Sequence, residues 1–248
     1  MAKIIIGNFK MNTDIKDLSL YLEDFLPKIK ERKTEVGLAL PYTHLFLASQ
    51  KLVSTNVKLG AQNVFYENNG AYTGEISPQM LKSISTDFVI IGHSERIILF
   101  NETNENINKK ILKCLEHNLK MVLCVGETKT ERKQNKTNQV LKKQIEYALK
   151  GVYENELKNI IIAYEPVWAI GTGLVATTKE IEKTIYDIRE IIKGSFSEKA
   201  SRSIKILYGG SANLSNYLPI IKIKGIDGLL VGGASLKSDE FAKMANLK

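Results

Sequence analysis

Short runs of β-branched and aliphatic residues recur eight times from one end of the chain to the other. Most of these runs are continuously apolar rather than alternating between apolar and polar positions. Continuous apolar runs are typical of strands that are buried on both faces of a parallel sheet. The pattern therefore predicts eight strands, at residues 4–6, 36–40, 57–60, 88–91, 121–125, 160–163, 204–207 and 229–231.

Polar segments with apolar residues at helical spacing separate these strands. The clearest are residues 104–117 and 178–194, and in the second we expect Thr178 to be the N-cap and Gly194 to end the helix. The charge-rich segment 129–143 predicts a solvated helix face. An alternation of strand and helix fits either an open doubly wound sheet or a closed barrel. Eight such units in 248 residues favour a single-domain (β/α)8 barrel over residues 1–248.

Composition excludes several classes of protein. With 44% hydrophobic and 25% charged residues, the chain is neither disordered nor fibrous. No apolar run approaches the ~18 residues that span a bilayer, and the N-terminal apolar segment is too short for a secretory signal. We therefore expect a cytoplasmic protein with no membrane partner. Two cysteines and three histidines without ligand spacing predict no metal site, and we expect Cys124 to be a buried core residue rather than a nucleophile.

The formal net charge of +8 leaves three interpretations open. A solvated basic surface is favoured, steering of a small anion comes second, and nucleic-acid binding comes last. A nucleic-acid surface needs its charge gathered in a patch or stripe, whereas these lysines and arginines are scattered through the predicted helices. We therefore expect no nucleic-acid partner.

Unusual residues gather directly after the predicted strands. In a barrel, the loops that follow the strands carry the chemistry, so these residues are expected to meet at one mouth. Paired glycines after the last two strands let backbone N–H groups face an anion, which favours phosphate binding over tight turns without a ligand. The five segments are 7–10, 92–96, 164–173, 208–211 and 232–235.

Three side chains at these strand ends are candidates for chemistry. Lys10, taken alone, is either a surface lysine or an electrostatic group, and its place beside a phosphate site favours the second role. His93 is either a structural residue or a neutral hydrogen-bond donor, and Ser94 is the predicted N-cap of the helix behind it. Glu165 directly follows an apolar strand, which favours a general base over a buried ion pair. Glu95 is expected to pair with Lys10 or with Arg96 rather than to transfer protons.

The segment after Glu165 is long for a connection in a compact domain, and such loops are often functional lids. We expect Trp168 and Ile170 to give its inner face an apolar character. The predicted lid comprises Pro166, Val167, Trp168, Ala169, Ile170, Gly171, Thr172, Gly173, Leu174, Val175 and Ala176.

Eight stretches in order and in spacing make the chain resemble the triosephosphate isomerase family over essentially its whole length. They are Gly-Asn-Phe-Lys-Met-Asn (7–12), Gly-Ala-Gln-Asn-Val (60–64), Gly-Ala-Tyr-Thr-Gly-Glu-Ile-Ser (70–77), Ile-Gly-His-Ser-Glu-Arg (91–96), Cys-Val-Gly-Glu-Thr (124–128), Ala-Tyr-Glu-Pro-Val-Trp-Ala-Ile-Gly-Thr-Gly (163–173), Leu-Tyr-Gly-Gly-Ser (207–211) and Gly-Leu-Leu-Val-Gly-Gly-Ala-Ser-Leu (228–236).

The resemblance implies the interconversion of dihydroxyacetone phosphate and D-glyceraldehyde 3-phosphate in glycolysis and gluconeogenesis, without a cofactor. It implies that Glu165 is the base and His93 the neutral electrophile, a division of roles known for this family. Asn8 and Lys10 then bind substrate, and Glu95 is the glutamate near Lys10. The resemblance further implies phosphate binding through the backbone N–H groups of Gly171, Ser211, Gly232 and Gly233.

The resemblance also implies a homodimer in which the segment around Thr73 reaches the partner's site near Asn8 and Lys10. The chain departs from the family pattern at the end of the lid, at Leu174 and Val175, which bears on lid closure rather than on chemistry. Ile97 replaces an arginine, so a salt bridge near the interface is expected to be missing. Phe9 replaces a tryptophan, and Asn135 stands where a glycine is common.

Two other functions remain to be weighed. Another sugar-phosphate isomerase barrel would share the glycine loops, but it would not need this lid. A non-catalytic phosphate- or nucleic-acid-binding protein could use the positive charge, and it would bind with a strong salt dependence and no turnover.

Overall fold

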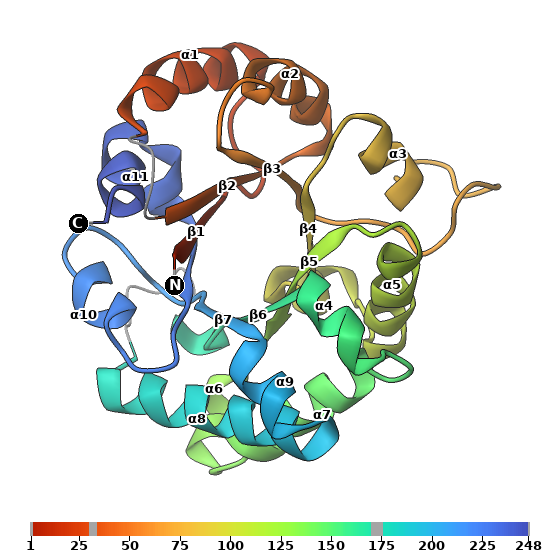
Figure 1. Ribbon diagram of the computed structural model, residues 1–248, viewed down its shortest axis with the longest axis vertical. Helices are drawn as coiled ribbons and strands as arrows, with labels where there is room; N and C mark the ends of the chain where they lie inside the picture. The colour runs from red at the N-terminus through yellow and green to blue at the C-terminus, as the bar shows by residue number, and fades with distance from the viewer. Residues whose placement is uncertain (1, 30–33, 170–175, 248) are drawn as a thin grey trace.

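Eight parallel strands close into a barrel in the computed structural model, which describes residues 2–29, 34–169 and 176–247. Each strand pairs with the next along the chain, and the last pairs with the first (Figure 1). The predicted (β/α)8 barrel and all eight predicted strands are therefore confirmed. The strands are β1 (Lys3–Asn8), β2 (Thr34–Leu40), β3 (Lys58–Ala61), β4 (Phe88–Ile91), β5 (Lys120–Val125), β6 (Ile160–Tyr164), β7 (Lys205–Tyr208) and β8 (Gly228–Val231).

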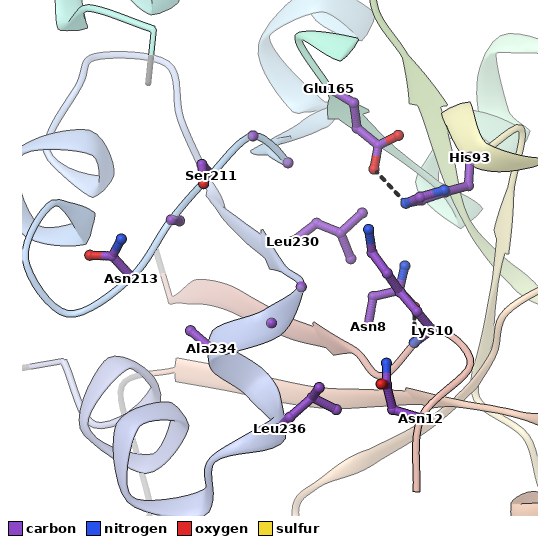
Figure 2. A pocket seen from close by; sticks show the side chains of 15 residues that line it. Asn8, Lys10, Asn12, His93, Glu165, Ser211, Asn213, Leu230, Ala234 and Leu236 are labelled. Carbon is purple, nitrogen blue, oxygen red and sulfur yellow. Dashed lines mark hydrogen bonds and ion pairs between the residues drawn. The ribbon is translucent and has the colours of Figure 1, made fainter. Parts of the chain in front are cut away.

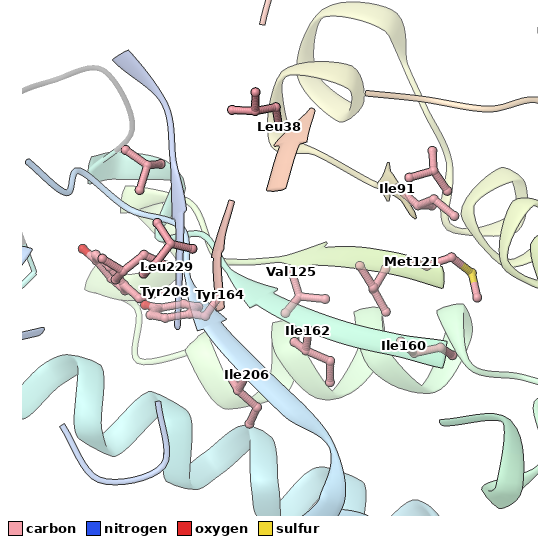
Figure 3. Close-up of a cluster of buried hydrophobic side chains, with 14 of the residues drawn as sticks. Leu38, Ile91, Met121, Val125, Ile160, Ile162, Tyr164, Ile206, Tyr208 and Leu229 are labelled. Atoms are coloured by element: carbon pink, nitrogen blue, oxygen red, sulfur yellow. The ribbon is translucent and has the colours of Figure 1, made fainter. Parts of the chain in front are cut away.

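The strands are continuously apolar because both of their faces are buried. Ile4 and Ile6 of β1 belong to a small cluster inside the barrel, whereas Ile5 between them belongs to the large cluster under the helices. Figure 3 shows part of that outer cluster, in which Tyr164 and Tyr208 lie side by side on β6 and β7 with ring centroids 6.3 Å apart. Alternate residues thus fill two cores, and no polar position is needed along a strand.

Helices form a ring around the strands (Figure 1). The α-helices are α1 (Ile15–Phe25), α2 (Tyr42–Leu52), α3 (Pro78–Ser83), α4 (Ser94–Phe100), α5 (Asn104–Glu116), α6 (Lys129–Lys133), α7 (Thr137–Ala148), α8 (Thr178–Ser195), α9 (Glu198–Ser203), α10 (Tyr217–Ile221) and α11 (Ser238–Ala245). Short 3-10 helices are η1 (Leu26–Lys28), η2 (Glu154–Asn159), η3 (Val167–Ala169) and η4 (Gly233–Leu236).

The two helices predicted most clearly are present as α5 and α8, but the predicted ends of α8 were wrong. Its N-cap is Thr177, one residue before the predicted Thr178, because the Thr177 side chain and Glu180 form a capping box. Gly194 lies inside the last turn rather than after it, and Phe196 is the C-cap. In an exposed last turn glycine weakens a helix without ending it.

The charge-rich segment 129–143 forms two helices, α6 and α7, rather than one helix face. Asn135 lies between them with φ of 56°. This left-handed conformation is open to glycine and, among other residues, favours asparagine. It explains how asparagine can occupy a position where glycine is common.

Cys124 is buried inside the barrel, as predicted, and Cys114 is buried on the inner face of α5. In the described part of the chain, no helix is both long and apolar enough to cross a membrane.

Candidate active site

A pocket of about 450 Å³ opens at the carboxyl ends of the strands (Figure 2). Residues from five strand ends contribute to it, although they lie far apart in the sequence. The structure brings together most of the predicted site residues at this one mouth. Those that line the pocket are Asn8, Lys10, His93, Glu165, Ser211, Gly232 and Gly233, together with Asn12, Gly209, Gly210, Ala212, Asn213, Leu230, Ala234 and Leu236.

Glu165 follows β6, and its carboxylate is almost completely buried, with 2% of the residue exposed. The backbone N–H of Ser94 donates a hydrogen bond to Oε2 at 3.3 Å, and Oε1 lies 3.3 Å from Nε2 of His93. Gly209 makes room for this side chain, since a Cβ there would lie 2.8 Å from Cγ of Glu165. The carboxylate is thus held by a few specific contacts in a position that is almost fully shielded from solvent.

His93 is the N-cap of α4, and the prediction that Ser94 would be the N-cap was wrong. Nδ1 of His93 accepts a hydrogen bond from the backbone N–H of Glu95 at 3.2 Å, so the ring takes the role expected of the serine hydroxyl. An accepting Nδ1 carries no proton. In the neutral ring the proton is therefore on Nε2, the atom that faces Glu165.

Lys10 is positioned by backbone contacts in a strained conformation. Its φ is 52°, its N–H donates to Oδ1 of Asn8 at 3.0 Å, and its carbonyl accepts from Nε2 of Gln62 at 2.9 Å. Nζ lies 2.5 Å from Oε1 of Glu95, the ion pair expected for that glutamate. The role of Gln62 was missed, although it belongs to one of the stretches that carry the resemblance (60–64).

The glycine loops after β7 and β8 form the side of the pocket opposite His93 (Figure 2). Ser211 follows β7, and Gly232 and Gly233 follow β8. The Lys10 side chain reaches this side as well, because Cε lies 3.5 Å from the place that a Cβ on Gly232 would take. Lys10 thus lies close to the glycine loop after β8 and lines the same pocket as Glu165 and His93. Gly171, the remaining predicted phosphate ligand, lies outside the described residues.

The beginning of the predicted lid is anchored by a buried carboxylate that sequence reasoning missed. Glu127 is fully buried, and its Oε1 accepts hydrogen bonds from Nε1 of Trp168 at 3.0 Å, from Arg132 at 2.9 Å and from the Tyr164 hydroxyl at 3.2 Å. The Arg132 guanidinium also lies over the Trp168 ring, 5.1 Å from its centroid. Glu127 could have been found, since it follows β5 as the other site residues follow their strands.

The described part of the lid consists of Pro166–Ala169 and Ala176. Val167–Ala169 form η3, Trp168 packs partly buried against the outer core, and Ala176 is buried. The predicted lid residues Ile170, Gly171, Thr172, Gly173, Leu174 and Val175 lie outside the described residues.

Comparison with known proteins finds one family that matches nearly the full chain. The family model described as triosephosphate isomerase matches residues 3–248. The chain belongs to the triosephosphate isomerase family. It is similar to proteins named triosephosphate isomerase from Alkaliphilus oremlandii (45% identical over 243 residues, 98% of each chain) and Clostridium tetani (43% over 245 residues, 99% of this chain and 96% of the relative). A third relative with this name, from Thermoanaerobacter pseudethanolicus, is 43% identical over 243 residues, 98% of each chain.

Within this family's pattern, the described departures are accommodated by packing. Phe9 is fully buried and meets Tyr21 edge to face, with ring centroids 4.9 Å apart. Ile97 packs partly buried against the outer core, while its neighbour Arg96 lies 3.4 Å from the buried carboxylate of Glu102. The expected loss of a salt bridge at Ile97 concerns an interface with a second chain and stays a prediction.

Burial shapes the chemistry of Cys124, which lies beneath the candidate base. Loss of solvent raises the pKa of its thiol well above the ordinary value, and the negative charge of Glu165 raises the pKa further. The thiol therefore stays protonated and hydrogen-bonds the carboxylate, a structural role rather than that of a nucleophile.

Proposed function

We propose that the chain is the isomerase that interconverts dihydroxyacetone phosphate and D-glyceraldehyde 3-phosphate, with Glu165 as base, His93 as electrophile and Lys10 as the positive charge. One observation carries this assignment. The Glu165 carboxylate and Nε2 of His93 converge at 3.3 Å from two different strands, in a pocket that also holds Lys10 and the glycine loops. In the cytoplasm this reaction would serve both glycolysis and gluconeogenesis.

The proposed reaction moves one proton between adjacent carbons. The Glu165 carboxylate removes a proton from the carbon next to the carbonyl, and the electrons of the broken C–H bond form the C=C bond of an enediolate. The carbonyl oxygen takes the negative charge, which Nε2–H of His93 and the Lys10 ammonium stabilise. A hydroxyl proton also passes, through Nε2 of His93, from the oxygen on the first carbon to the former carbonyl oxygen, and return of the carbon-bound proton to the other carbon then gives the isomer. A positioned base supplies roughly 10²–10⁴-fold in rate, and each donor to the oxyanion about 10²–10³-fold.

The phosphate group would bind to the backbone N–H groups of Ser211, Gly232 and Gly233, with Gly171 added from the lid. Asn8 would contact the substrate from the β1 side, and Lys10 would face the phosphate and the oxyanion together. The pocket volume of about 450 Å³ suits a small ligand. Closure of the lid would exclude water, which strengthens these electrostatic contacts and protects the enediolate from losing phosphate.

A coupled assay with glyceraldehyde 3-phosphate tests the proposal. We expect turnover by the wild type and a loss of about 10²–10⁴-fold in kcat for Glu165→Gln and Glu165→Asp. Full activity in both variants would exclude Glu165 as the base, whereas absence of turnover in the wild type would exclude the reaction itself. A panel of other sugar phosphates separates this function from that of another phosphate-binding isomerase barrel.

A homodimer is part of the same proposal, and large exposed apolar side chains support it. Met11, Phe46 and Phe100 are 96%, 62% and 65% exposed, which is costly for a monomer. A second hollow of about 270 Å³ lies beside the Lys10–Glu95 pair and is lined in part by Met11 and Phe100. The exposed loop around Thr73 of a partner subunit would fill this hollow.

Sedimentation at several protein concentrations tests the dimer. We expect twice the 27.8 kDa mass of the chain for the wild type. Thr73→Arg should shift the protein toward monomer and lower kcat, because the hollow beside Glu95 would stay open. Ser54→Arg, an equally exposed change in the turn after α2, serves as control. A wild type that sediments as a monomer at every concentration would refute this assembly.

A further inference from the structure

The amino ends of the strands, at the mouth opposite the active site, carry a ring of positive charge. Each odd-numbered strand begins with a lysine, namely Lys3 of β1, Lys58 of β3, Lys120 of β5 and Lys205 of β7. Because all strands are parallel, these four residues gather at one end of the barrel. Burial lowers the pKa of Lys3, Asp227 counteracts that shift, and the neighbouring Lys205 lowers the pKa by a smaller amount.

This mouth is hollow rather than flat. Two adjoining hollows, of about 460 and 670 Å³, share Ile4, Glu35, Lys120 and Ile161. The ring of Phe88 fills the barrel above them and lines the first hollow, because Gly37 and Gly60 leave room for it. Each hollow therefore has an apolar floor and a polar rim, and each has the size of a small-molecule site.

The lysines on the rim of the two hollows fall into two groups, those that pair with an acidic side chain and those that do not. On the rim, Lys58 and Lys205 pair with Asp87 and Asp227. Among the residues that the structure describes, four exposed rim lysines have no ion pair, namely Lys82, Lys120, Lys158 and Lys199.

We propose that this mouth, which we call the basic mouth, binds a small anion that carries more than one phosphate group. The four free lysines come from four different elements, α3, β5, η2 and α9, so one phosphate group cannot engage them all. A chain of phosphates along the rim can, and an attached apolar ring system can rest on the floor formed by Ile4, Ile161 and Phe88. A nucleoside triphosphate has this combination of features. Glu35, where the two hollows meet, and Glu154, which lines the second hollow, oppose the anion and limit its affinity.

Calorimetric titration tests the basic mouth with ATP, inorganic tripolyphosphate and AMP as probes. The titrations are made in excess dihydroxyacetone phosphate, which occupies the active site, and at low and at moderate salt. The test variant replaces Lys120, Lys158 and Lys199 by glutamine. The control variant replaces Lys136, Lys143 and Lys179 by glutamine. These exposed lysines lie on α7, on α8 or at the cap of α7 and line neither hollow, so both variants lose the same net charge.

We expect the wild type to bind ATP and tripolyphosphate and to bind AMP much more weakly. The test variant should lose about tenfold in affinity, since each exposed charge contact is worth a small factor, and the control variant should stay within about twofold of the wild type. Glu35→Gln should bind more tightly than the wild type. Isomerase turnover should be the same in all variants. Absence of binding, complete displacement by the substrate, or an equal loss in both lysine variants would overturn the proposal.

Discussion

The Nε2 atom of His93 lies 3.3 Å from Oε1 of Glu165, although β4 and β6 are separated by a whole strand of the barrel. The contact depends on the start of α4, since the backbone N–H of Glu95 occupies Nδ1 and that of Ser94 holds the carboxylate. One helix end therefore sets both the proton position on the imidazole and the place of the Glu165 carboxylate. Any change at this helix end acts on both side chains together.

Replacement of His93 by glutamine should lower kcat by about 10²–10³-fold, because one donor to the oxyanion is lost or misplaced. KM should change much less, since the phosphate contacts stay in place. The coupled assay measures both constants. His117→Gln is the control, because the His117 ring hydrogen-bonds the side chain of Asn68, at 2.7 Å, and does not line the pocket. An unchanged kcat in His93→Gln would show that Nε2 does not act on the substrate.

Gly126 is required for the path of the chain at Glu165. A Cβ at this position would lie 1.7 Å from the backbone oxygen of Glu165, so Gly126→Ala must displace that residue. A displacement of about 1 Å can cost 10²-fold in rate, and we expect a loss of that order in kcat.

Gly194→Ala is the matched control, because nothing lies within 4 Å of the added methyl group. It should leave kcat unchanged and stabilise the protein by about 0.5–1 kcal/mol, since alanine is the better helix residue. Equal activities of the two variants would mean that the backbone of Glu165 tolerates movement.

Lys110 is buried beside the carboxylate of Glu102 and the side-chain oxygen of Asn63, with which its Nζ hydrogen-bonds. Burial lowers the pKa of this lysine, and Glu102 counteracts the shift. Lys110→Met should reduce the free energy of unfolding by about 3–5 kcal/mol, because Glu102 would keep a buried charge without this partner. Urea denaturation at one protein concentration measures the change.

The neighbouring Lys109 provides the control for that measurement. It pairs with Glu105 at 2.7 Å on the exposed face of the same helix, so Lys109→Met should have no measurable effect. The double variant Lys110→Met with Glu102→Gln should recover part of the lost stability. If Lys110→Met were as stable as Lys109→Met, the buried pair would contribute nothing.

The strands were predictable because several consecutive residues in each of them carry the same apolar signal. In β1, Ile4, Ile5 and Ile6 face two different cores in turn, so the whole run must be apolar. Helix ends depend instead on one local geometry. Thr177 and Thr178 are both capping residues, and only the contact with Glu180 decides between them. The pattern cannot supply that contact.

The site was predictable where a residue type is unusual for its position, and it was missed where the residue acts through another. Glu165 and His93 stand out at strand ends, and the barrel topology then brings them together. Glu127 and Gln62 act by holding Trp168 and Lys10, and nothing in their own spacing reveals those partners. That His93 rather than Ser94 caps α4 could not be predicted either, because the cap depends on the rotamer of the His93 ring.

The two thiols give a prediction about pH. Burial raises the pKa of Cys114 to about 12 and that of Cys124 well above its ordinary value, whereas an unfolded thiol titrates near ~8.5. Above about pH 8.5 the unfolded chain therefore releases thiol protons that the folded chain keeps, and stability falls as the pH rises. Between pH 8 and 9.5 the free energy of unfolding should decrease less steeply in Cys114→Ala than in the wild type.

At pH 8 a thiol reagent should label the native protein slowly and the urea-unfolded protein at once, and rapid labelling of native Cys124 would show that the thiol is accessible.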